Sequence, residues 1–457
     1  MKNILQSALI SVILMILWPS WLFSQPESVR WVKSAGGSLD DQATNVAVDG
    51  NRNTVVVGFY QGTATFGDTS LAPFGDLDIF IAKYDLEGKL LWVQRAGGAS
   101  EDKANSVAFD QQGNIFVSGS FDDTVVFGNT TLTAHNSGNP VTRDFFVAKF
   151  NPDGDLMWVQ QTDASTGTQF ALGVAVDSQG NCVVTGLFWI SITIGGTTLT
   201  EAVSNAQDEI FVFKCDPDGN VLWAKSAGGP GADIGFDIIT DSDDNILLTG
   251  WSARKVDFGS GVQLTSNSNS EDIFIAKYDK NGNIAWAKNA GSSGEDRGFA
   301  IASLGTDFYI TGKFQNTIEF DSSHVRFSNG GDDIFAAKYD GSGTLQWLNT
   351  AGGSGDDQGR GIAVNKIFSD VELFVTGSFN DRVDFGRDAL TSDGADDIFL
   401  ASYDNFDGDD NWAEQSGGSQ TDLGIAVAAT PGGNGIVAGL FSDRAQFLFR
   451  SATSNGG

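Results

Sequence analysis

The sequence predicts an all-β fold, a seven-bladed β-propeller of four-stranded antiparallel blades. Three observations lead to it. Tryptophan recurs at intervals of 61–66 residues, taken as differences between residue numbers, so one supersecondary unit is repeated. Each repeat contains short β-rich runs bounded by Gly, Asn and Asp. Beyond the first residues, no window keeps a helical period. The tryptophans that mark the expected blade boundaries are Trp31, Trp92, Trp158, Trp223, Trp286, Trp347 and Trp412.

Residues 1–24 are expected to form a signal peptide, and residues 25–457 a single propeller domain. Lys2 precedes an apolar run from Ile4 to Trp18, and the small Ser24 stands before Gln25, as in secretory leaders. The alternative is an uncleaved membrane anchor. No later stretch is long and apolar enough to span a bilayer as a helix.

The composition excludes two classes of partner. The chain has a formal net charge of −31 and a pI near 4.1, so it repels nucleic-acid phosphates and anionic membrane surfaces. Its hydrophobic fraction of 41% is ample for a packed core, so the acidity belongs to a solvated surface and not to a disordered chain.

Residues 40–97 illustrate one repeat. NVAVD is the expected first strand, TVVVGFY running on toward TATFG the second, DIFIAKYD the third and LLWVQRA the fourth. In every copy of the last hairpin, Gly precedes Trp by four residues. The glycine suits a turn position with positive φ, and the tryptophan is expected to wedge between neighbouring blades.

Small residues recur at two alternate positions of the first strand, as in Asn45 and Ala47, and they would let blades approach near the axis. Asp237 and Ile239 break this rule in the fourth repeat.

The two ends of the chain are expected to meet. Val29–Ala35 resembles an isolated fourth strand, and the last repeat stops at SNGG before any third strand. We therefore expect the N-terminal strand to complete the last blade and seal the ring. One strand would still be missing, which indicates a truncated chain or, as the alternative, a three-stranded last blade.

The repeated string W-x-x-x-AGG-x-x-x-D, VAVD-x-x-GN-x-x-VTG-x-F and DIF-x-AKYD-x-x-G-x-x-x-W resembles the bacterial seven-bladed beta-propeller repeat (SBBP) family over essentially the whole mature chain. The resemblance implies a protein secreted or displayed on the outer surface of a Gram-negative bacterium, with no shared catalytic activity. Many similar chains continue into a sorting domain for type IX secretion or into adhesive modules, which here would lie beyond Gly457.

AKYDLEGKLLW also looks like the tryptophan-docking motif of quinoprotein dehydrogenases. The motif's Thr is absent from every copy, and its Lys occurs only as Lys89. Those enzymes use eight blades, so we interpret the likeness as a shared hairpin and not as a cofactor site.

One aspartate precedes the first strand of nearly every repeat. It either contributes to a cation site, most plausibly for Ca²⁺, or accepts backbone N–H bonds within its own turn; the second interpretation is favoured, and no other cofactor is expected. The weak metal candidates are Asp41, Asp102, Asp233, Asp296, Asp357 and Asp422, with Gln169 in the third repeat.

A second acidic row begins the third strand, and a lysine follows five residues later in the same strand, as in Asp78 and Lys83. The two point to opposite faces, so their partners come from other strands. Exposed pairs of this kind stabilise by about 0–1 kcal/mol each.

Cys182 and Cys215 stand at adjacent ends of two strands of the third repeat, where they form either a disulfide or two buried thiols. His135 and His324 lie in variable loops of different repeats, with no nucleophile or metal motif beside them.

These observations predict an exported, monomeric, non-catalytic scaffold that binds an extracellular protein or polysaccharide through variable loops between the second and third strands. The alternative is a propeller enzyme, such as a polysaccharide lyase or a quinoprotein dehydrogenase. The third and fourth repeats depart most from the consensus, so a ligand site is first sought at Trp189, Trp251 and Asp237.

Overall fold

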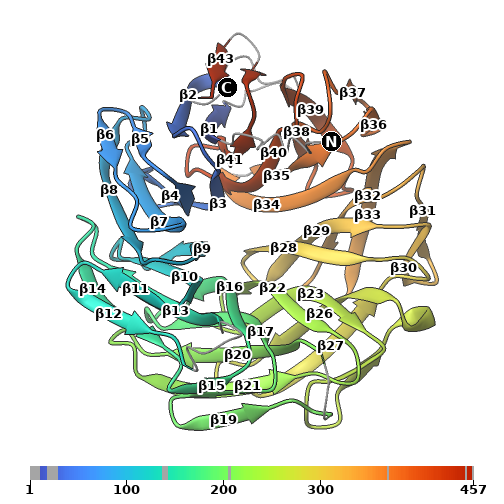
Figure 1. The fold of residues 1–457 in the computed structure, drawn as a ribbon. Coiled ribbons are helices and arrows are strands. Elements are labelled where there is room, and N and C mark those ends of the chain that lie inside the picture. Colours follow the sequence, from blue (N-terminus) through green and yellow to red (C-terminus); the bar gives the residue numbers. More distant parts are fainter. Residues whose placement is uncertain are drawn as a thin grey trace, which may run out of the picture.

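The computed structural model describes residues 11–17, 29–135, 143–203, 207–367, 370–447 and 450–454. Within these ranges the regular structure consists of antiparallel strands and one short 3-10 turn, η1 (Asn267–Asn269). The sheets stand around a common centre in a propeller-like arrangement (Figure 1). No helix in the described part of the chain is long and apolar enough to cross a membrane.

Each repeat builds a four-stranded antiparallel sheet whose first strand lies nearest the centre. The units are β3 (Asp41–Val48), β4 (Thr54–Gln61), β7 (Leu77–Tyr84) and β8 (Leu90–Gly97); β9 (Asp102–Phe109), β10 (Ile115–Asp122), β13 (Arg143–Phe150) and β14 (Leu156–Gln161); β16 (Gln169–Val176), β17 (Cys182–Phe188), β20 (Glu209–Cys215) and β21 (Val221–Ala227); β22 (Asp233–Thr240), β23 (Ile246–Ala253), β26 (Glu271–Tyr278) and β27 (Ile284–Ala290); β28 (Arg297–Leu304), β29 (Asp307–Phe314), β32 (Asp333–Tyr339) and β33 (Leu345–Gly353); β34 (Gln358–Ile367), β35 (Asp370–Phe379), β38 (Asp397–Tyr403) and β39 (Asp410–Gly417); and β40 (Leu423–Ala429), β41 (Gly435–Phe441), β1 (Ser11–Leu17) and β2 (Val29–Gly36).

A short hairpin follows the second strand of each repeat, so the expectation that the second strand runs on continuously is wrong. The chain turns after β4 because Gly62 takes a φ of +70°. The equivalent residues also have positive φ, namely Asp123, Ile190, Arg254, Asn316, Asp381 and Asp443. The hairpins are β5 (Ala64–Phe66) and β6 (Thr69–Leu71); β11 (Thr124–Phe127) and β12 (Thr130–Thr133); β18 (Ser191–Ile194) and β19 (Thr197–Thr200); β24 (Lys255–Asp257) and β25 (Gln263–Thr265); β30 (Thr317–Asp321) and β31 (His324–Phe327); β36 (Arg382–Asp384) and β37 (Ala389–Thr391); and β42 (Arg444–Phe447) and β43 (Arg450–Thr453).

These hairpins attach to the preceding unit and not to their own. β5 pairs with β2, β11 with β8, β36 with β33 and β42 with β39. In the third repeat the hairpin pairs with β15 (Ala164–Thr166), a short strand after β14. Neighbouring units are therefore joined by backbone hydrogen bonds as well as by side-chain packing.

The hydrophobic core lies between adjacent sheets. Val55 and Ile79 of the first unit pack in one cluster with Val117 and Phe146 of the second. The middle strands are covered on both faces, and every residue of β7 is buried. This burial explains why third strands have nearly continuous apolar runs instead of a clean alternation.

The tryptophans lie between units as the sequence predicts. Trp31 covers the turn glycine Gly88 of the next unit, where a Cβ atom would fall 2.7 Å from the indole. Its Nε1 donates a hydrogen bond to the Leu86 carbonyl at 3.0 Å. Gly154, Gly219, Gly282, Gly343 and Gly408 lie under Trp92, Trp158, Trp223, Trp286 and Trp347 in the same way.

A lysine in five of the third strands reinforces this contact, whereas Ser402 stands at that position in β38. Lys83 Nζ donates to the Pro152 carbonyl of the next unit at 3.0 Å, and that carbonyl also accepts from Trp92 Nε1. Each lysine also pairs with an aspartate of its own unit at 2.7–3.7 Å, in the pairs Lys83–Asp49, Lys149–Asp110, Lys214–Asp177, Lys277–Asp241 and Lys338–Asp307. Most of these side chains are buried, so the expectation of an exposed lattice is wrong.

The last sheet contains a strand from the predicted leader. β1 pairs with β41 over Ser11–Ile16 and with β2 over Val12–Leu17, so it occupies the third-strand position. The structure therefore differs from the expectation that this unit lacks a strand. Residues 1–10, 18–28 and 455–457 lie outside the described residues, and leader cleavage stays a prediction.

Cys182 and Cys215 face each other directly across β17 and β20 and form a disulfide, with their Cα atoms 5.2 Å apart. The bond closes a loop with a sequence separation of 33. Replacing both cysteines by alanine is expected to cost about 2–4 kcal/mol of unfolding free energy. Denaturant midpoints with and without reductant test this, since the double variant should be insensitive to reductant. Equal midpoints for the oxidised wild type and the variant would contradict the prediction.

Candidate functional site

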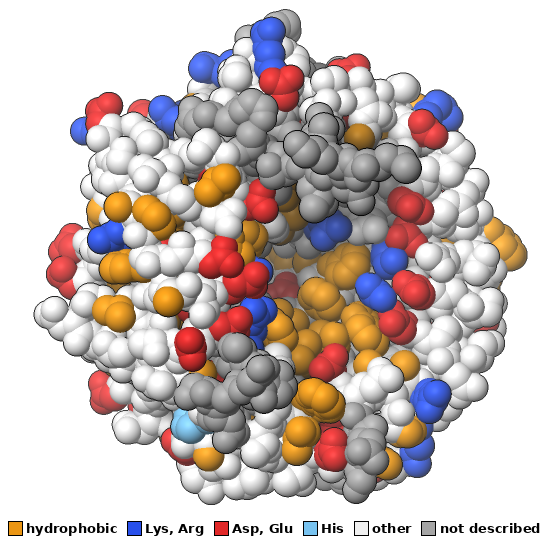
Figure 2. Space-filling model, in the orientation of Figure 1, with side chains coloured by type: hydrophobic (Ala, Val, Ile, Leu, Met, Phe, Trp, Pro, Cys, Tyr) orange, Lys and Arg blue, Asp and Glu red, His pale blue; other side chains and the backbone are white. Residues whose placement is uncertain are grey.

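A hollow lies at the common centre of the sheets. It is a cavity of about 820 Å³ lined mostly by the first strands. Figure 2 shows this face hollowed at its centre, with hydrophobic side chains inside and charged side chains around them. We refer to it as the axial cavity.

One position of every first strand faces the axial cavity. It lies three residues after the aspartate position of each repeat, just before the small-residue positions. Its side chains differ from repeat to repeat while the surrounding strand is conserved between repeats. Its members are Thr44, Asn105, Leu172, Phe236, Phe299, Arg360 and Ile425, and all of them line the cavity.

The polar members of this inner position are partly committed to structure. Thr44 Oγ1 donates to the Ala104 carbonyl of the next unit at 2.8 Å. Asn105 Nδ2 donates to the Ala171 carbonyl at 2.9 Å. Phe236 and Phe299 instead form an edge-to-face pair with ring centroids 5.4 Å apart. The cavity therefore has a polar arc that bridges units and an aromatic arc that faces the cavity.

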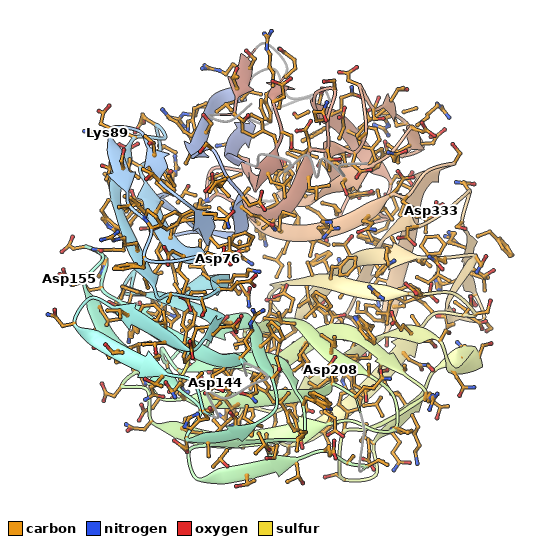
Figure 3. All side chains as sticks on the ribbon, viewed as in Figure 1. Asp76, Lys89, Asp144, Asp155, Asp208 and Asp333 are labelled. Carbon is orange, nitrogen blue, oxygen red and sulfur yellow. A yellow bond between two sulfur atoms is a disulfide. The ribbon has the colours of Figure 1, made fainter. Side chains whose placement is uncertain are left out.

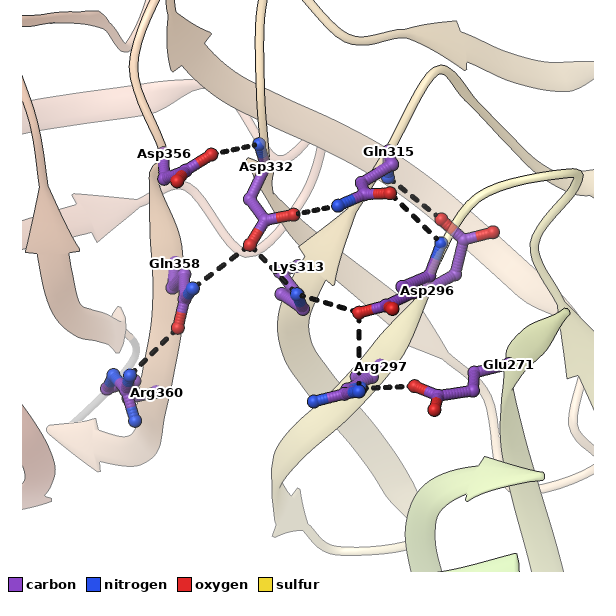
Figure 4. Close-up of polar contacts among 10 residues, drawn as sticks. Glu271, Asp296, Arg297, Lys313, Gln315, Asp332, Asp356, Gln358 and Arg360 are labelled. Carbon is purple, nitrogen blue, oxygen red and sulfur yellow. Dashed lines mark hydrogen bonds and ion pairs between the residues drawn. The ribbon is translucent and has the colours of Figure 1, made fainter. Parts of the chain in front are cut away.

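A cationic side adjoins the aromatic arc and comprises Arg297, Lys313 and Arg360, which all line the cavity. Figure 4 shows the contacts that hold it. Arg297 lies over the Trp251 ring at 5.2 Å and pairs with Glu271 and Glu295. Lys313 pairs with Asp332 at 2.8 Å. Two of the three cations that line the cavity therefore have carboxylate partners.

Asp332 is the hub of this network. Its carboxylate accepts hydrogen bonds from Lys313 at 2.8 Å, from Gln315 at 2.8 Å and from Gln358 at 3.0 Å. Three side-chain donors on one buried carboxylate hold one another in place. The arrangement fixes the orientation of the Gln358 side chain, whose Oε1 points toward Arg360.

Arg360 differs from the other two cations. Its Nη2 donates to Gln358 Oε1 at 2.9 Å, and its guanidinium lies 5.9 Å from the Phe299 ring centroid. Its buried Nε has no hydrogen-bond partner, and no carboxylate pairs with it among the described residues. Burial lowers the pKa of this guanidinium, partly offset by the charges of Asp396 and Asp332.

Two of the three residues singled out from the sequence lie at this site. Asp237 lines the axial cavity, and its carboxylate accepts backbone bonds from Ile238 and from Ile301 of the next unit, both at 2.9 Å. Burial raises its pKa to about 6. Trp251 lies under Arg297. Trp189 is exposed in a turn between β17 and β18 and does not line the cavity.

The six candidate metal residues are dispersed, and each is buried at or just before the start of a different first strand. Asp41 accepts from Gly37 N at 2.6 Å, and Asp296 from Ser292 N at 2.7 Å and Gln315 N at 3.0 Å. Asp357 and Asp422 are bound in the same way, whereas the oxygens of Asp102 and Asp233 lack a well-formed bond. Within the described ranges no three His, Cys, Asp or Glu side chains gather in a metal-binding group.

Burial controls the protonation of these carboxyl groups. It raises the pKa of Asp102 and of Asp233 to about 8, and backbone hydrogen bonds hold that of Asp296 nearer to about 7. Burial likewise raises the pKa of Asp41, Asp357 and Asp422 to about 7.

The second acidic row shares one structural role. Asp333 accepts from Asn329 N, and Asp144 accepts from His135 N, so each carboxylate binds a backbone amide that precedes its strand. Both aspartates are labelled in Figure 3. His135 Nδ1 also contacts Asp144 at 2.7 Å, and Ser165 Oγ donates to the other oxygen of Asp144 at 2.8 Å. The serine thus bonds to the aspartate, whereas in a catalytic triad the hydroxyl bonds to the imidazole. His324 pairs with Asp321 in an outer hairpin.

Sequence reasoning missed Arg360, Arg297 and Lys313. The available signal was an arginine at an inner position that is neutral in the other repeats. Lys313 lies directly across from Arg297 in the pairing of β28 with β29. The grouping of these two residues with Arg360 could not be seen, because it depends on the packing of two adjacent units.

Comparisons with known proteins agree with the fold. Residues 91–120 match the SBBP family, described as a beta-propeller repeat. An uncharacterized WD repeat-containing protein of Acanthamoeba polyphaga mimivirus is 25% identical over 342 residues, covering 58% of this chain and 24% of that protein. The regulatory protein FlaEY of Caulobacter vibrioides is 22% identical over 78% of this chain and 38% of its own length. The chain thus matches well under half of each relative's length.

Among solved structures, an apocarotenoid oxygenase of Synechocystis aligns over 90% of both chains, at 9% identity and a TM-score of 0.42. A likeness this weak carries no argument about activity. The period, the sheet topology and the matched segment together show that this chain is a beta-propeller repeat protein with an SBBP repeat.

Proposed function

We propose that the chain is an exported, non-catalytic binding module, a closed seven-bladed β-propeller that holds its ligand in the axial cavity. The observation that carries the proposal is the inner position. The same place in each repeat is filled by Thr, Asn, Leu, Phe, Phe, Arg and Ile, and all of these side chains line one hollow. A purely structural channel needs no such variety, whereas a ligand site gains its specificity from it.

Closure of the ring is supported by the way the first and last repeats pack. Ala426 and Ile436 of the last repeat share a hydrophobic cluster with Val46 and Val56 of the first. β2, from the start of the chain, lies in the same sheet as β40 and β41. We therefore count the last sheet as the seventh blade, and a monomer is the expected state.

The proposed ligand is an extracellular protein or glycan, part of which enters the cavity. A volume of about 820 Å³ lies within the range of small-molecule sites. It suits the end of a sugar chain or a protruding side chain better than a folded domain. Recognition would extend onto the variable loops around the mouth. The proposal includes the location of the protein, which is secreted or displayed on the outer surface of a Gram-negative bacterium.

The absence of catalysis is proposed because the groups most suited to acid–base chemistry lie elsewhere or are already bonded. His135 and His324 are not among the cavity-lining residues, and the Asp237 carboxylate is bonded to backbone amides. The alternative is a propeller enzyme, such as a polysaccharide lyase or a quinoprotein dehydrogenase. It predicts that a bound glycan is cleaved or an added cofactor reduced.

A glycan array, probed once with calcium and once with chelator, tests the proposal. We expect binding to a restricted set of glycans, intact after incubation, with no dependence on calcium. A calcium requirement would instead support the hypothesis that the six aspartates before the first strands contribute to a cation site. Cleaved products would establish the enzyme instead, and silence on both the array and a matched panel of surface proteins would overturn the binding module.

A further inference from the structure

Resting on this proposed function, we infer that Arg360 anchors the carboxylate of an acidic sugar, so that the axial cavity recognises a uronate residue at the end of a glycan. Three features of the cavity carry this inference: a guanidinium with unused donors, an aromatic arc beside it, and oxygen acceptors elsewhere in the lining.

Arg360 has the donor capacity for a further partner. A guanidinium presents five N–H donors in a rigid fork that matches a carboxylate. Only the bond from Nη2 to Gln358 is formed, while the buried Nε has no partner in the part of the chain that the structure describes. A buried charged donor left unsatisfied is costly, and a ligand carboxylate would remove that cost.

Gln358 holds the fork in place. Its Nε2 donates to Asp332 at 3.0 Å and its Oε1 accepts from Arg360 at 2.9 Å. Asp332 is itself fixed by Lys313 and Gln315. The guanidinium is therefore preorganised, which reduces the entropy that a ligand would lose on binding.

The rest of the cavity suits a sugar ring. The edge-to-face pair of Phe236 and Phe299 offers apolar surface next to Arg360, on which the C–H face of a pyranose can pack. The Asp237 carboxylate and the Ser106 hydroxyl also line the cavity. Both already accept backbone N–H bonds, and their remaining lone pairs can accept from sugar hydroxyl groups. An aliphatic carboxylate would leave these acceptors unused.

The net charge of −31 argues against an acidic ligand only at long range. Repulsion from distant charges is screened over about 8 Å at physiological ionic strength, whereas a pair formed inside the cavity is screened less. Arg297 and Lys313 already have carboxylate partners, so the expected specificity depends on Arg360.

The test compares methyl β-glucuronoside with methyl β-glucoside by calorimetry and saturation-transfer NMR. The two sugars differ only at C6, which is a carboxylate in the first and a hydroxymethyl group in the second. We expect the wild type to bind the glucuronoside about tenfold or more tightly than the glucoside, as for a charge-assisted hydrogen bond. Arg360→Gln should lose this preference while keeping its affinity for the glucoside. Arg360→Lys should recover part of it, because lysine keeps the charge but not the fork.

Arg382→Gln is the matched control, since Arg382 is an exposed arginine of an outer hairpin and should leave both affinities unchanged. Circular dichroism shows whether each variant is folded, and Arg360→Lys keeps the test valid if Arg360→Gln is not. Equal wild-type affinities for the two sugars, no binding of the glucuronoside, or an unchanged preference in Arg360→Gln would each overturn the inference. If ligands from the array bind wild type and Arg360→Gln equally, the proposed binding module is retained and the role of Arg360 as an anchor is rejected.

Discussion

Replacing Trp347 by alanine is expected to lower the unfolding free energy by about 3–5 kcal/mol, the usual cost of truncating a buried aromatic side chain. Trp347 is only 5% exposed, covers Gly408 of the next unit and donates to the Asn405 carbonyl at 3.2 Å. Its loss opens a cavity between two sheets and leaves that carbonyl with one donor fewer. Denaturant unfolding followed by circular dichroism measures the change.

Phe406→Ala is the matched control, because Phe406 belongs to the turn that Trp347 covers, between Asn405 and Gly408, but is itself 90% exposed. It should change the unfolding free energy by less than about 0.5 kcal/mol. Gly408→Ala should destabilise on its own, since its Cβ would lie 2.6 Å from the Trp347 ring at a φ of +79°. In the double variant the clash disappears and only the φ strain remains. Its loss of unfolding free energy should therefore be smaller than the sum of the losses in the two single variants. Full additivity would show that the ring and the glycine do not depend on each other.

Acidification from pH 8 to pH 5 is expected to stabilise the protein. Six buried aspartates have folded-state pKa values of about 7–8, above the unfolded value of 3.8. Between these limits the folded chain binds more protons than the unfolded chain, so the unfolding free energy falls as pH rises. The contribution is complete below about pH 4 and is lost as pH passes through 7–8. We expect a change on the order of 1 kcal/mol for each group.

Asp102→Asn isolates one of these titrations. The amide has the shape of the neutral carboxyl group, so the variant should be more stable than wild type at pH 8 and equal to it near pH 5. Asp216→Asn is the control, because hydrogen bonds to Asn220 lower the pKa of this exposed turn aspartate. It should leave the slope between pH 5 and pH 8 unchanged. The test is the thermal unfolding midpoint of each protein between pH 5 and pH 8. A wild-type midpoint that does not change with pH would show that these carboxyl groups titrate as in the unfolded chain.

The four-stranded repeat could be predicted because its hairpins are local. The wedge could be predicted because it recurs in each repeat, although Trp31 covers Gly88 of the next unit. Gly88 and Trp92 belong to one hairpin, and the repeated spacing reveals the turn. The placement of the short hairpins could not be predicted. Their strands have only three to five residues, and the direction of the chain depends on positive φ at residues such as Ile190 and Arg254, which have no strong preference for it.

The site was harder to predict than the fold. Asp237 and Trp251 attracted notice because they break the consensus of their own repeat. Arg360 acquires meaning only when Phe299, Gln358 and Asp332, from two neighbouring units, surround it. A sequence pattern gives the position of a side chain within its strand, but the cavity is formed by strands that lie about sixty residues apart.

Each short hairpin attaches to the preceding unit. One period of the sequence therefore contributes strands to two neighbouring units in space. A fragment excised at any tryptophan would take away its neighbour's outer edge and leave its own edge bare. Insertion or loss of a whole period during evolution would therefore disturb the two flanking sheets as well as the one that is gained or lost.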